Sequence, residues 1–294
     1  MRTLFTGVSR GTEALVVRGQ VPASEWERMR SPFQEGDFPF PVRYGYLNVG
    51  VVEQGPDSLV GRTVFTLFPH QSAFIVPEDA VALVPSGVPP RRAVLAGAVE
   101  TAVNVLWDAG PRVGDAIAIV GAGMIGGAIA VLAAQLPGAV VTLIDVDPDK
   151  RSLATELGVD FAHPDAAACD YDITIEASGT AEGLAVALRA AATDGEVVVA
   201  SWYGSAARQL DLGADFHSRR LTLRASQVGE VAQARRGRRT RHDRLDLALR
   251  LLENDVFDAL LGSDSSWGEL PAVMAALAEG APDPLCHTID WSRP

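Results

Sequence analysis

A glycine-rich turn between two apolar segments constrains the fold of this chain more than any other feature. The apolar segment 117–120 runs directly into the sequence Gly-Ala-Gly-Met-Ile-Gly. In such a turn Gly121 permits a tight bend, Gly123 lets backbone N–H groups approach a pyrophosphate, and Gly126 lets a helix pack against a strand. The start of that helix would offer unpaired N–H groups and the positive end of its dipole to the anion. The pattern predicts a strand–turn–helix unit that binds a dinucleotide.

An acid at the end of the next apolar segment completes this unit. Asp145 follows the segment 139–144 and stands 24 residues after Gly121. A carboxylate in this place accepts hydrogen bonds from both ribose hydroxyls and repels a 2′-phosphate, which favours NAD over NADP. The alternative is that Asp145 is a helix cap or turn residue ahead of Pro148.

The composition is that of a globular chain. Of its 294 residues 48% are hydrophobic and 21% are charged, which is enough for a large core. A net charge of −12 argues against binding to nucleic acid or to an anionic membrane. Cys169 and Cys286 are too few for a disulfide framework or a four-cysteine zinc lobe. No apolar run could span a membrane and the N-terminus lacks a signal peptide, so we expect a cytoplasmic protein.

The spacing of apolar residues divides the chain into two parts with different predicted secondary structure. Up to about residue 90, short β-type runs punctuated by Gly and Pro predict a small barrel. Helices and strands alternate after that, which predicts a doubly wound parallel sheet. The predicted helices are 93–109, 124–136, 149–157, 181–192, 244–253 and 270–279, and the strands between them are 116–120, 140–144, 172–179 and 195–201. We expect a catalytic segment at 1–95, a nucleotide-binding domain at 96–225 and a return to the catalytic domain at 226–294.

The order of these parts resembles the medium-chain dehydrogenase/reductase superfamily of alcohol dehydrogenase-like enzymes over nearly the whole chain. The segments that carry the resemblance are Gly7–Glu13, Gly45–Val52, Val113–Asp115, Glu176–Gly179 and Trp267–Gly280. Two others, Ser9–Glu13 and Phe68–Gln71, are similar to the branch near bacteriochlorophyllide a dehydrogenase. The resemblance implies an α/β protein with a Rossmann sheet and a GroES-like, partly open β-barrel. It also implies a small-molecule substrate and a homodimer, with a barrel that is shortened at its N-terminus.

The positions that resemble the superfamily's catalytic zinc ligands hold other residues. Ser9 and Gly97 stand near the positions of two cysteines, and Tyr46 stands at that of the histidine. Neutral hydroxyls and glycine cannot replace thiolate and imidazole as zinc ligands, so we expect catalysis without a metal. The alternative is a new metal site formed by His70 and Glu100.

Without zinc, the polarisation of a carbonyl and the delivery of a proton would fall to side chains. By resemblance the hydroxyl of Tyr46 lies near the nicotinamide, where a phenol could donate a proton to an alkoxide, and Thr12 matches the hydroxyl that starts a proton relay. Tyr46 could instead merely fill space against Leu47. His70 could be an acid or a relay because imidazole titrates near neutrality, or it could be a surface loop residue.

Glu100 is a further catalytic candidate. It lies four residues before Asn104 in a predicted helix, so that both side chains share one helix face. An acid inside such an apolar helix is costly to bury unpaired. Glu100 could therefore face a catalytic cleft, or it could form an ion pair with an arginine such as Arg10.

Several residues are expected to contact the cofactor by resemblance or by their place at strand ends. Arg10 resembles an arginine that binds the pyrophosphate, a task suited to its bidentate fork. Thr101 resembles a threonine packed on the nicotinamide. Segments 201–204 and 225–228 follow predicted strands at carboxyl ends, where ligands of such sheets bind. The expected cofactor-binding residues are Gly121, Gly123, Met124, Ile125, Gly126, Asp145, Arg10, Thr101, Ser178, Ser201, Trp202 and Ser226.

An arginine-rich segment at 235–244 is unusual in so acidic a chain. It carries six arginines in ten residues. It could recognise an anionic substrate, because guanidinium forks match phosphate and carboxylate groups. The alternative is a solvated helix face that offsets nearby acids.

Taken together, the sequence predicts an NAD-dependent, zinc-independent oxidoreductase that interconverts a secondary alcohol and a ketone. Reduction of an activated C=C bond, as in quinone or enoyl reductases, is an alternative within enzymes. A non-catalytic NAD-sensing or interaction protein is an alternative from another class, because the loss of zinc ligands also fits lost chemistry.

Overall fold

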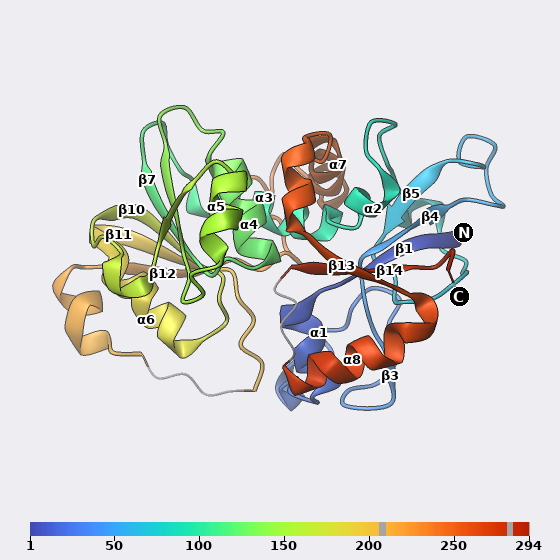
Figure 1. Cartoon of the computed structure of the whole chain (residues 1–294), viewed down its shortest axis with the longest axis horizontal. Coiled ribbons are helices and arrows are strands. Elements are labelled where there is room, and N and C mark those ends of the chain that lie inside the picture. The colour runs from blue at the N-terminus through green and yellow to red at the C-terminus, as the bar shows by residue number, and fades with distance from the viewer. Residues whose placement is uncertain (206–209, 281–284, 294) are drawn as a thin grey trace. The chain divides into compact units, whose positions relative to one another are not determined.

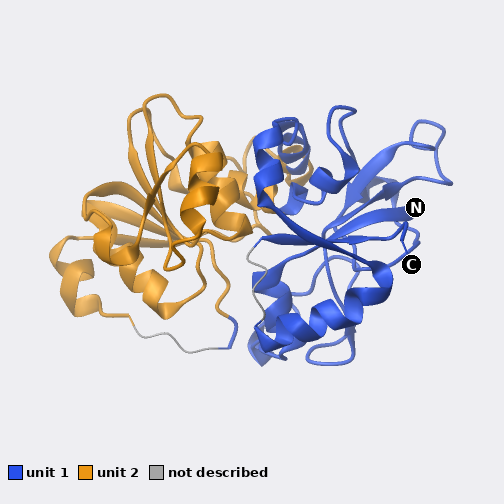
Figure 2. Cartoon of the chain, in the orientation of Figure 1, with its two compact units in different colours: residues 1–97, 204–206, 245–294 blue, residues 98–203, 207–244 orange. Residues whose placement is uncertain are grey.

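The computed structural model describes residues 1–205, 210–280 and 285–293. The chain forms two compact units (Figure 2). Unit 1 comprises residues 1–97, 204–206 and 245–294, and unit 2 comprises residues 98–203 and 207–244. Within the described part of the chain, no helix is long and apolar enough to cross a membrane.

Unit 2 is built on a six-stranded sheet in which every pairing is parallel (Figure 1). Its strand order is β12-β11-β10-β7-β8-β9, so the order reverses between β7 and β10. The strands are β7 (Ala116–Val120), β8 (Val140–Ile144), β9 (Asp160–Ala162), β10 (Tyr171–Glu176), β11 (Ala191–Val199) and β12 (Thr222–Ala225). The helices are α3 (Ala96–Ala109, of which residues 98–109 belong to unit 2), α4 (Met124–Ala133), α5 (Lys150–Glu156) and α6 (Ala181–Ala190). The predicted doubly wound parallel sheet is confirmed.

The apolar runs of the sequence form the core of unit 2. Residues 117–120 of β7 and 141–144 of β8 are all buried. Continuous apolar strands are typical of a parallel sheet that is covered on both faces. Helices α4 and α6 pack on β7, and α5 packs on β9. This packing fixes the carboxyl ends of the strands, where the glycine turn lies.

Unit 1 contains a second six-stranded sheet with the order β13-β14-β1-β4-β5-β6. All its pairings are antiparallel except the parallel pair β13 and β14. The strands are β1 (Arg2–Val8), β4 (Asn48–Val51), β5 (Thr63–Thr66), β6 (Ala82–Leu83), β13 (Leu261–Ser266) and β14 (Cys286–Asp290), and a small hairpin joins β2 (Glu35–Gly36) to β3 (Val42–Arg43). The helices are α1 (Arg10–Val17), α2 (Pro90–Ala93) and α8 (Leu270–Glu279), and α7 (Arg241–Leu251) enters unit 1 at Leu245. A separate antiparallel sheet domain is therefore present, as expected.

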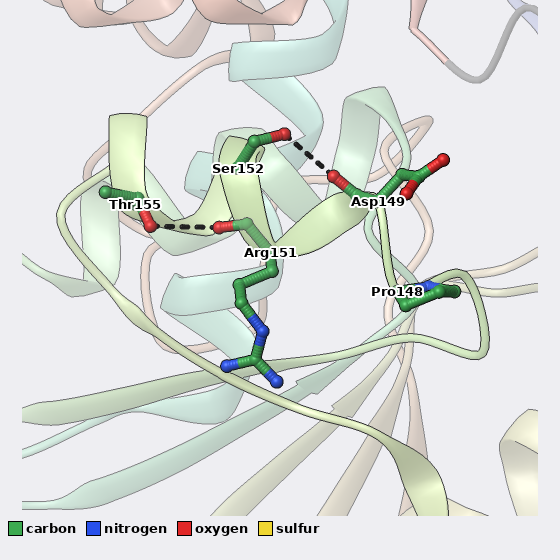
Figure 3. Close-up of a pocket in the computed structure, with 5 residues that line it drawn as sticks. All are labelled: Pro148, Asp149, Arg151, Ser152 and Thr155. Atoms are coloured by element: carbon green, nitrogen blue, oxygen red, sulfur yellow. Dashed lines mark hydrogen bonds between the residues drawn. The ribbon is translucent and has the colours of Figure 1, made fainter.

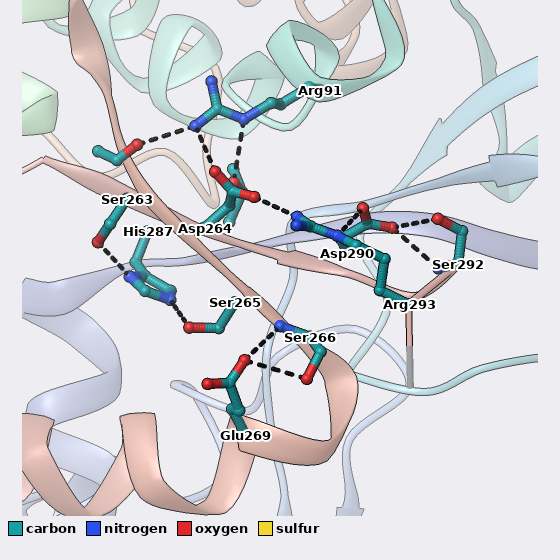
Figure 4. A network of polar contacts seen from close by, with 12 residues as sticks. Arg91, Ser263, Asp264, Ser265, Ser266, Glu269, His287, Asp290, Ser292 and Arg293 are labelled. Carbon is teal, nitrogen blue, oxygen red and sulfur yellow. Dashed lines mark hydrogen bonds and ion pairs between the residues drawn. The ribbon is translucent and has the colours of Figure 1, made fainter.

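A polar network holds the edge of this sheet together (Figure 4). The imidazole of His287 on β14 lies between the hydroxyls of Ser263 and Ser265 on β13, at 2.9 and 3.1 Å. Arg91 of α2 donates to the hydroxyl of Thr288 on β14 at 3.2 Å. Polar bonds thus hold β13 in the sheet in place of apolar packing. Because its sequence is mostly polar, the apolar pattern did not predict this strand.

Residues 226–244 cluster with unit 2, whereas the sequence assigned them to the returning catalytic segment. The physical reason is Arg244, which is 1% exposed and donates to the carbonyl oxygens of Val228 and Glu230. The same guanidinium bonds to Glu100 and Asn104 of α3. The loop after β12 is thus bonded to a helix of unit 2.

Candidate functional site

The glycine turn of unit 2 has the geometry that a dinucleotide requires. Gly121 has φ +107°, and a Cβ there would lie 2.7 Å from the backbone nitrogen of Ser178. A Cβ on Gly126 would lie 1.8 Å from the carbonyl oxygen of Gly121. Neither position can therefore carry a side chain. Gly123 caps α4 without a side chain, so no side-chain oxygen competes for the first N–H groups of the helix.

Asp145 lies at the end of β8 beside this turn. One carboxylate oxygen accepts the Ala122 N–H at 2.6 Å, and the other accepts the Asp147 N–H at 2.9 Å. The bond to Asp147 is that of a turn residue, and the bond to Ala122 fixes the acid against the glycine turn. A carboxylate oxygen can accept more than one hydrogen bond. Asp145 can therefore be a turn residue and still accept hydrogen bonds from ribose hydroxyls.

The segment after Asp145 forms an open pocket of about 510 Å³ on α5 (Figure 3). Its lining residues are Pro148, Asp149, Arg151, Ser152 and Thr155. The two hydroxyls are bonded within the helix, Ser152 to the Asp149 carbonyl and Thr155 to the Arg151 carbonyl. The guanidinium of Arg151 lies 4.8 Å from the ring centroid of Phe161. Its charged lining groups are the Asp149 carboxylate and the Arg151 guanidinium.

Two loops meet at the carboxyl ends of β10 and β11. The buried carboxylate of Glu176 accepts hydrogen bonds from the N–H and hydroxyl of Ser178 and from the N–H of Gly179. Its second oxygen accepts the Tyr203 hydroxyl at 2.7 Å. The sequence singled out Ser178 and the segment 201–204 but not the Glu176–Tyr203 bond, because nothing local links the two residues.

Tyr46 lies in a polar cluster of unit 1. The side chains of Ser9 and Thr12 lie close enough to its hydroxyl to affect the pKa of the phenol. Burial raises the pKa of Tyr46 to about 12, these two side chains lower it, and the charge of Glu13 raises it. The phenol is therefore protonated at neutral pH and can donate a hydrogen bond. The ring of Tyr44 packs edge-on against Tyr46 at 6.1 Å, and burial also raises the pKa of Tyr44.

A histidine and an acid form the next layer of this cluster. The His70 side chain is 6% exposed, and its Nε2 lies 3.0 Å from a carboxylate oxygen of Glu13. Its Nδ1 lies 2.7 Å from the hydroxyl of Thr6, which accepts a hydrogen bond from the indole N–H of Trp291. In the neutral imidazole, Nε2 then carries the proton and Nδ1 accepts the Thr6 hydroxyl. His70 lies in a loop as predicted, but the interpretation as a surface residue is wrong, because both ring nitrogens are bonded inside unit 1.

Glu13 links this pair to Tyr46. Its other carboxylate oxygen accepts the backbone N–H of Ser9 at 2.8 Å. Ser9 precedes α1, so this bond fixes the residue whose hydroxyl reaches Tyr46. Thr12 and Glu13 lie in the first turns of the same helix. The sequence missed α1, whose eight residues include Gly11.

The donor set around Tyr46 does not fit zinc. Across residues 1–205, 210–280 and 285–293, no three His, Cys, Asp or Glu side chains are placed to hold a metal ion. A Cβ on Gly97 would lie 2.5 Å from Cδ2 of Leu47, so Leu47 fills the space that a side chain at position 97 would need. His70 is bonded to Thr6 and Glu13, and Glu100 is bonded to Arg244. These observations do not support the alternative of a new metal site formed by those two residues.

Glu100 has a structural partner. Its carboxylate lies 3.0 Å from the Arg244 guanidinium, and both side chains are nearly fully buried. Burial raises the pKa of Glu100, and the charge of Arg244 lowers it. The expected ion pair is present, with Arg244 in place of Arg10. Arg10 itself is exposed at the start of α1 in unit 1.

The remaining cofactor candidates of unit 2 lie on α3 and after two strand ends. Thr101 is half-buried on α3, and Ser201 and Trp202 are half-buried after β11. Ser226 follows β12, and its hydroxyl donates to Asp108 at 2.6 Å. The Ser226 hydroxyl thus bonds to another side chain of unit 2. The segment 225–228 lies at the carboxyl end of β12, as expected.

Part of the arginine-rich segment contacts other residues of unit 2. Arg236 donates to the carbonyl of Val231, and Arg241 pairs with Glu230 at 2.8 Å. The Arg235 guanidinium lies 6.0 Å from the Trp107 ring centroid. The segment before α7 is exposed, and Arg244 is buried. The structure thus agrees with a solvated surface over most of this segment, but not at Arg244.

Comparisons with known proteins agree with this architecture. The sequence model of the zinc-binding dehydrogenase family matches residues 127–243. D-guloside 3-dehydrogenase of Escherichia coli is 28% identical over 249 residues, which are 74% of this chain and 70% of that relative.

Solved structures give the same result for the fold. L-idonate 5-dehydrogenase of Escherichia coli superimposes with a TM-score of 0.76 at 17% identity, over 99% of this chain and 90% of that one. A zinc-binding dehydrogenase of Sinorhizobium meliloti bound to NADP has a TM-score of 0.75, also at 17% identity, over 98% and 90% of the two chains.

Proposed function

We propose that the chain is a member of the medium-chain dehydrogenase/reductase superfamily and an alcohol dehydrogenase-like oxidoreductase with a nicotinamide cofactor, and we propose its specific reaction on that premise. The protein is an NAD(H)-dependent, zinc-independent enzyme that interconverts a secondary alcohol and a ketone. The observation that carries this proposal is the protonated phenol of Tyr46 beside the hydroxyls of Ser9 and Thr12, in a part of the chain where the described residues form no metal ligand set. The three parts of the proposal, namely cofactor, proton donor and substrate, rest on different observations.

The preference for NAD over NADP rests on Asp145. Its carboxylate is fixed against the glycine turn by the Ala122 N–H, at the end of the strand where the adenosine ribose binds in such folds. A negative charge there accepts hydrogen bonds from ribose hydroxyls and repels a phosphate on the 2′-oxygen. Structural neighbours hold either cofactor, NADP in one and NADH in another, so the proposed preference rests on Asp145 alone.

Tyr46 is the proposed proton donor to the reacting oxygen. When bound, the reduced cofactor supplies the hydride that adds to the carbonyl carbon. The carbonyl oxygen then takes the Tyr46 proton, and the hydroxyls of Ser9 and Thr12 stabilise the resulting phenolate by donating hydrogen bonds to it. In the direction of alcohol oxidation the same groups take up the proton. Tyr46 is protonated at neutral pH, as this role in reduction requires.

The pair of Glu13 and His70 positions this donor. Glu13 holds the Ser9 backbone, and His70 holds Glu13 through Nε2. A carboxylate buried at 3% exposure needs such partners, because an unpaired buried charge is strongly unfavourable. We therefore assign His70 to the support of the Tyr46 cluster, with Thr12 in direct contact with the Tyr46 hydroxyl.

The proposed substrate class is a sugar or polyol that carries a secondary hydroxyl. The relative at 28% identity is named for oxidation at position 3 of a guloside, and a structural neighbour is named for idonate. The internal partners of Arg236, Arg241 and Arg244 argue against an anion site built from the whole arginine-rich segment. A neutral polyhydroxylated substrate is consistent with the hydroxyls gathered around Tyr46.

The experiment that tests the proposal is turnover of the purified protein with NAD⁺ and a panel of sugars, sugar acids and polyols, followed at 340 nm. Quinones and enones with NADH form the second arm, and binding of NADH without any turnover forms the third. Oxidation of a secondary alcohol supports the proposal. Turnover in the second arm alone, or binding with no turnover in either, would contradict it.

A further inference from the structure

Glu176 is a buried acid that the proposed chemistry does not use. It ends β10 and is fully buried. One carboxylate oxygen accepts three hydrogen bonds, from the N–H of Ser178 at 2.7 Å, the hydroxyl of Ser178 at 2.6 Å and the N–H of Gly179 at 2.9 Å. The other oxygen accepts the Tyr203 hydroxyl at 2.7 Å. Neutral groups thus supply all four of these bonds.

The groups around Glu176 are hydrogen-bond donors that suit a carboxylate acceptor. Two of the donors are backbone N–H groups, which cannot reverse and accept a proton from a carboxylic acid. Carboxylates held by several such donors remain charged even when buried. Among the described residues, Glu176 forms no ion pair with Lys, Arg or His. The Glu176 side chain therefore has no cationic neighbour at this strand end within the described residues.

The topology places Glu176 on one particular half of the dinucleotide site. The strand order reverses between β7 and β10, and a dinucleotide binds across the sheet at that point. Asp145 on β8 marks the adenosine side of the glycine turn. The nicotinamide half then extends the other way, over the ends of β10 and β11, where Glu176 and Tyr203 lie. Ser178 meanwhile packs on Gly121 itself.

We propose that Glu176 is a fixed charge that favours the oxidised, positively charged nicotinamide ring over the neutral reduced ring, and so biases the protein toward alcohol oxidation. The inference rests on the proposed nicotinamide cofactor. The two redox forms differ at this end of the molecule by one positive charge on the ring, whereas their pyrophosphates are identical. Any repulsion between Glu176 and the pyrophosphate therefore cancels in the ratio of the two dissociation constants. Charges in a protein interior interact over roughly 10 Å because screening there is weak.

The structure offers a variant that removes the charge and keeps the bonds. In Glu176→Gln, the amide oxygen can accept the three hydrogen bonds from Ser178 and Gly179. The amide nitrogen then faces the Tyr203 hydroxyl, which can rotate to accept instead of donate. Tyr203→Phe is the matched control, because it removes one hydrogen bond and leaves the charge in place.

The test measures the dissociation constants of NAD⁺ and NADH for the whole protein by calorimetry or fluorescence. We expect Glu176→Gln to weaken NAD⁺ binding relative to NADH binding by about fivefold. This is the scale of the interaction between two unit charges roughly 10 Å apart. Tyr203→Phe should lower both affinities together and keep their ratio. An unchanged ratio in a folded Glu176→Gln protein would overturn the inference.

Two further measurements keep the outcomes distinct. If Glu176→Gln does not fold, Glu176→Ser is the second variant that removes the charge, and it should shift the same ratio in the same direction. A ratio equal to that of the unmodified protein would then overturn the inference. Failure of the unmodified protein to bind either form would contradict the proposed function itself, whereas binding of both with a ratio insensitive to Glu176 would contradict only the role of this charge.

Discussion

The guanidinium of Arg244 lies 3.0 Å from the carboxylate of Glu100, although the two residues are 144 positions apart in the chain. The same arginine bonds to Asn104 and to the carbonyls of Val228 and Glu230. One buried side chain therefore joins α3 to the loop that follows β12. This loop lies at the carboxyl end of the sheet, where the dinucleotide is expected.

The first prediction concerns this ion pair. Arg244→Met should lower the free energy of unfolding by about 3–5 kcal/mol, because it leaves the Glu100 carboxylate buried without its partner. Arg241→Gln is the control, since Arg241 pairs with the exposed Glu230 and such pairs contribute at most about 1 kcal/mol. Urea denaturation of both variants gives the comparison. Equal free energies of unfolding for the two variants would contradict the prediction, because the buried pair would then stabilise the fold no more than the exposed pair.

The second prediction concerns cofactor choice. Asp145→Ser should weaken NADH binding by about tenfold and narrow the preference over NADPH, because a charged hydrogen-bond acceptor for the ribose is lost. Asp145→Asn is the control, since its amide oxygen can still accept the Ala122 N–H. It separates the loss of charge from the loss of the turn. Calorimetry that found tighter binding of NADPH to the unmodified protein would refute the assignment.

The third prediction concerns zinc. The purified protein should lack stoichiometric zinc, because position 97 has no room for a ligand and Tyr46 and Ser9 offer hydroxyls. Chelators should leave the turnover unchanged. Elemental analysis showing about one zinc per chain, with activity lost on chelation, would be incompatible with the proposed mechanism.

The fourth prediction concerns the titration of Tyr46. Because burial raises its pKa to about 12, its phenol should remain protonated through the neutral range. A raised folded-state pKa stabilises the fold fully below the unfolded value of 10.0, and this contribution is lost as the pH rises from there through 12. Absorbance titration at 295 nm, compared between the unmodified protein and Tyr46→Phe, isolates this group. A phenol that ionises near pH 9 would contradict the geometry.

The nucleotide-binding half could be predicted because its rules are local. Its strands 116–120 and 140–144 match the observed elements to the residue, as does the helix 270–279 of unit 1. Each combines a run of apolar residues with a nearby glycine, proline or acid that ends it. The predicted helix 124–136 ends at Ala133 in the structure, a difference within the usual fraying of helix ends.

The parts that were missed depend on contacts between distant segments. The strand Leu261–Ser266 is polar and carries little alternation, and it pairs with β14 through a ladder and the hydroxyl bonds of His287. His70 follows a proline in a loop, yet Thr6 and Glu13 bury it from far along the chain. The sequence groups Arg244 with five other arginines, for which it offers anion recognition or a solvated face, because sequence spacing carries no information on the distant partner Glu100.

The measurement that tests the account most directly is the turnover of Tyr46→Phe. This variant keeps the ring and its edge-on packing with Tyr44 and removes only the hydroxyl, so folding and NADH affinity should survive. If Tyr46 is the proton donor, turnover should fall by about a hundredfold or more, the scale for loss of a general acid. Tyr44→Phe, the matched control, should retain most of the activity. Turnover of Tyr46→Phe equal to that of the unmodified protein would show that Tyr46 only fills space, and would contradict the proposed mechanism.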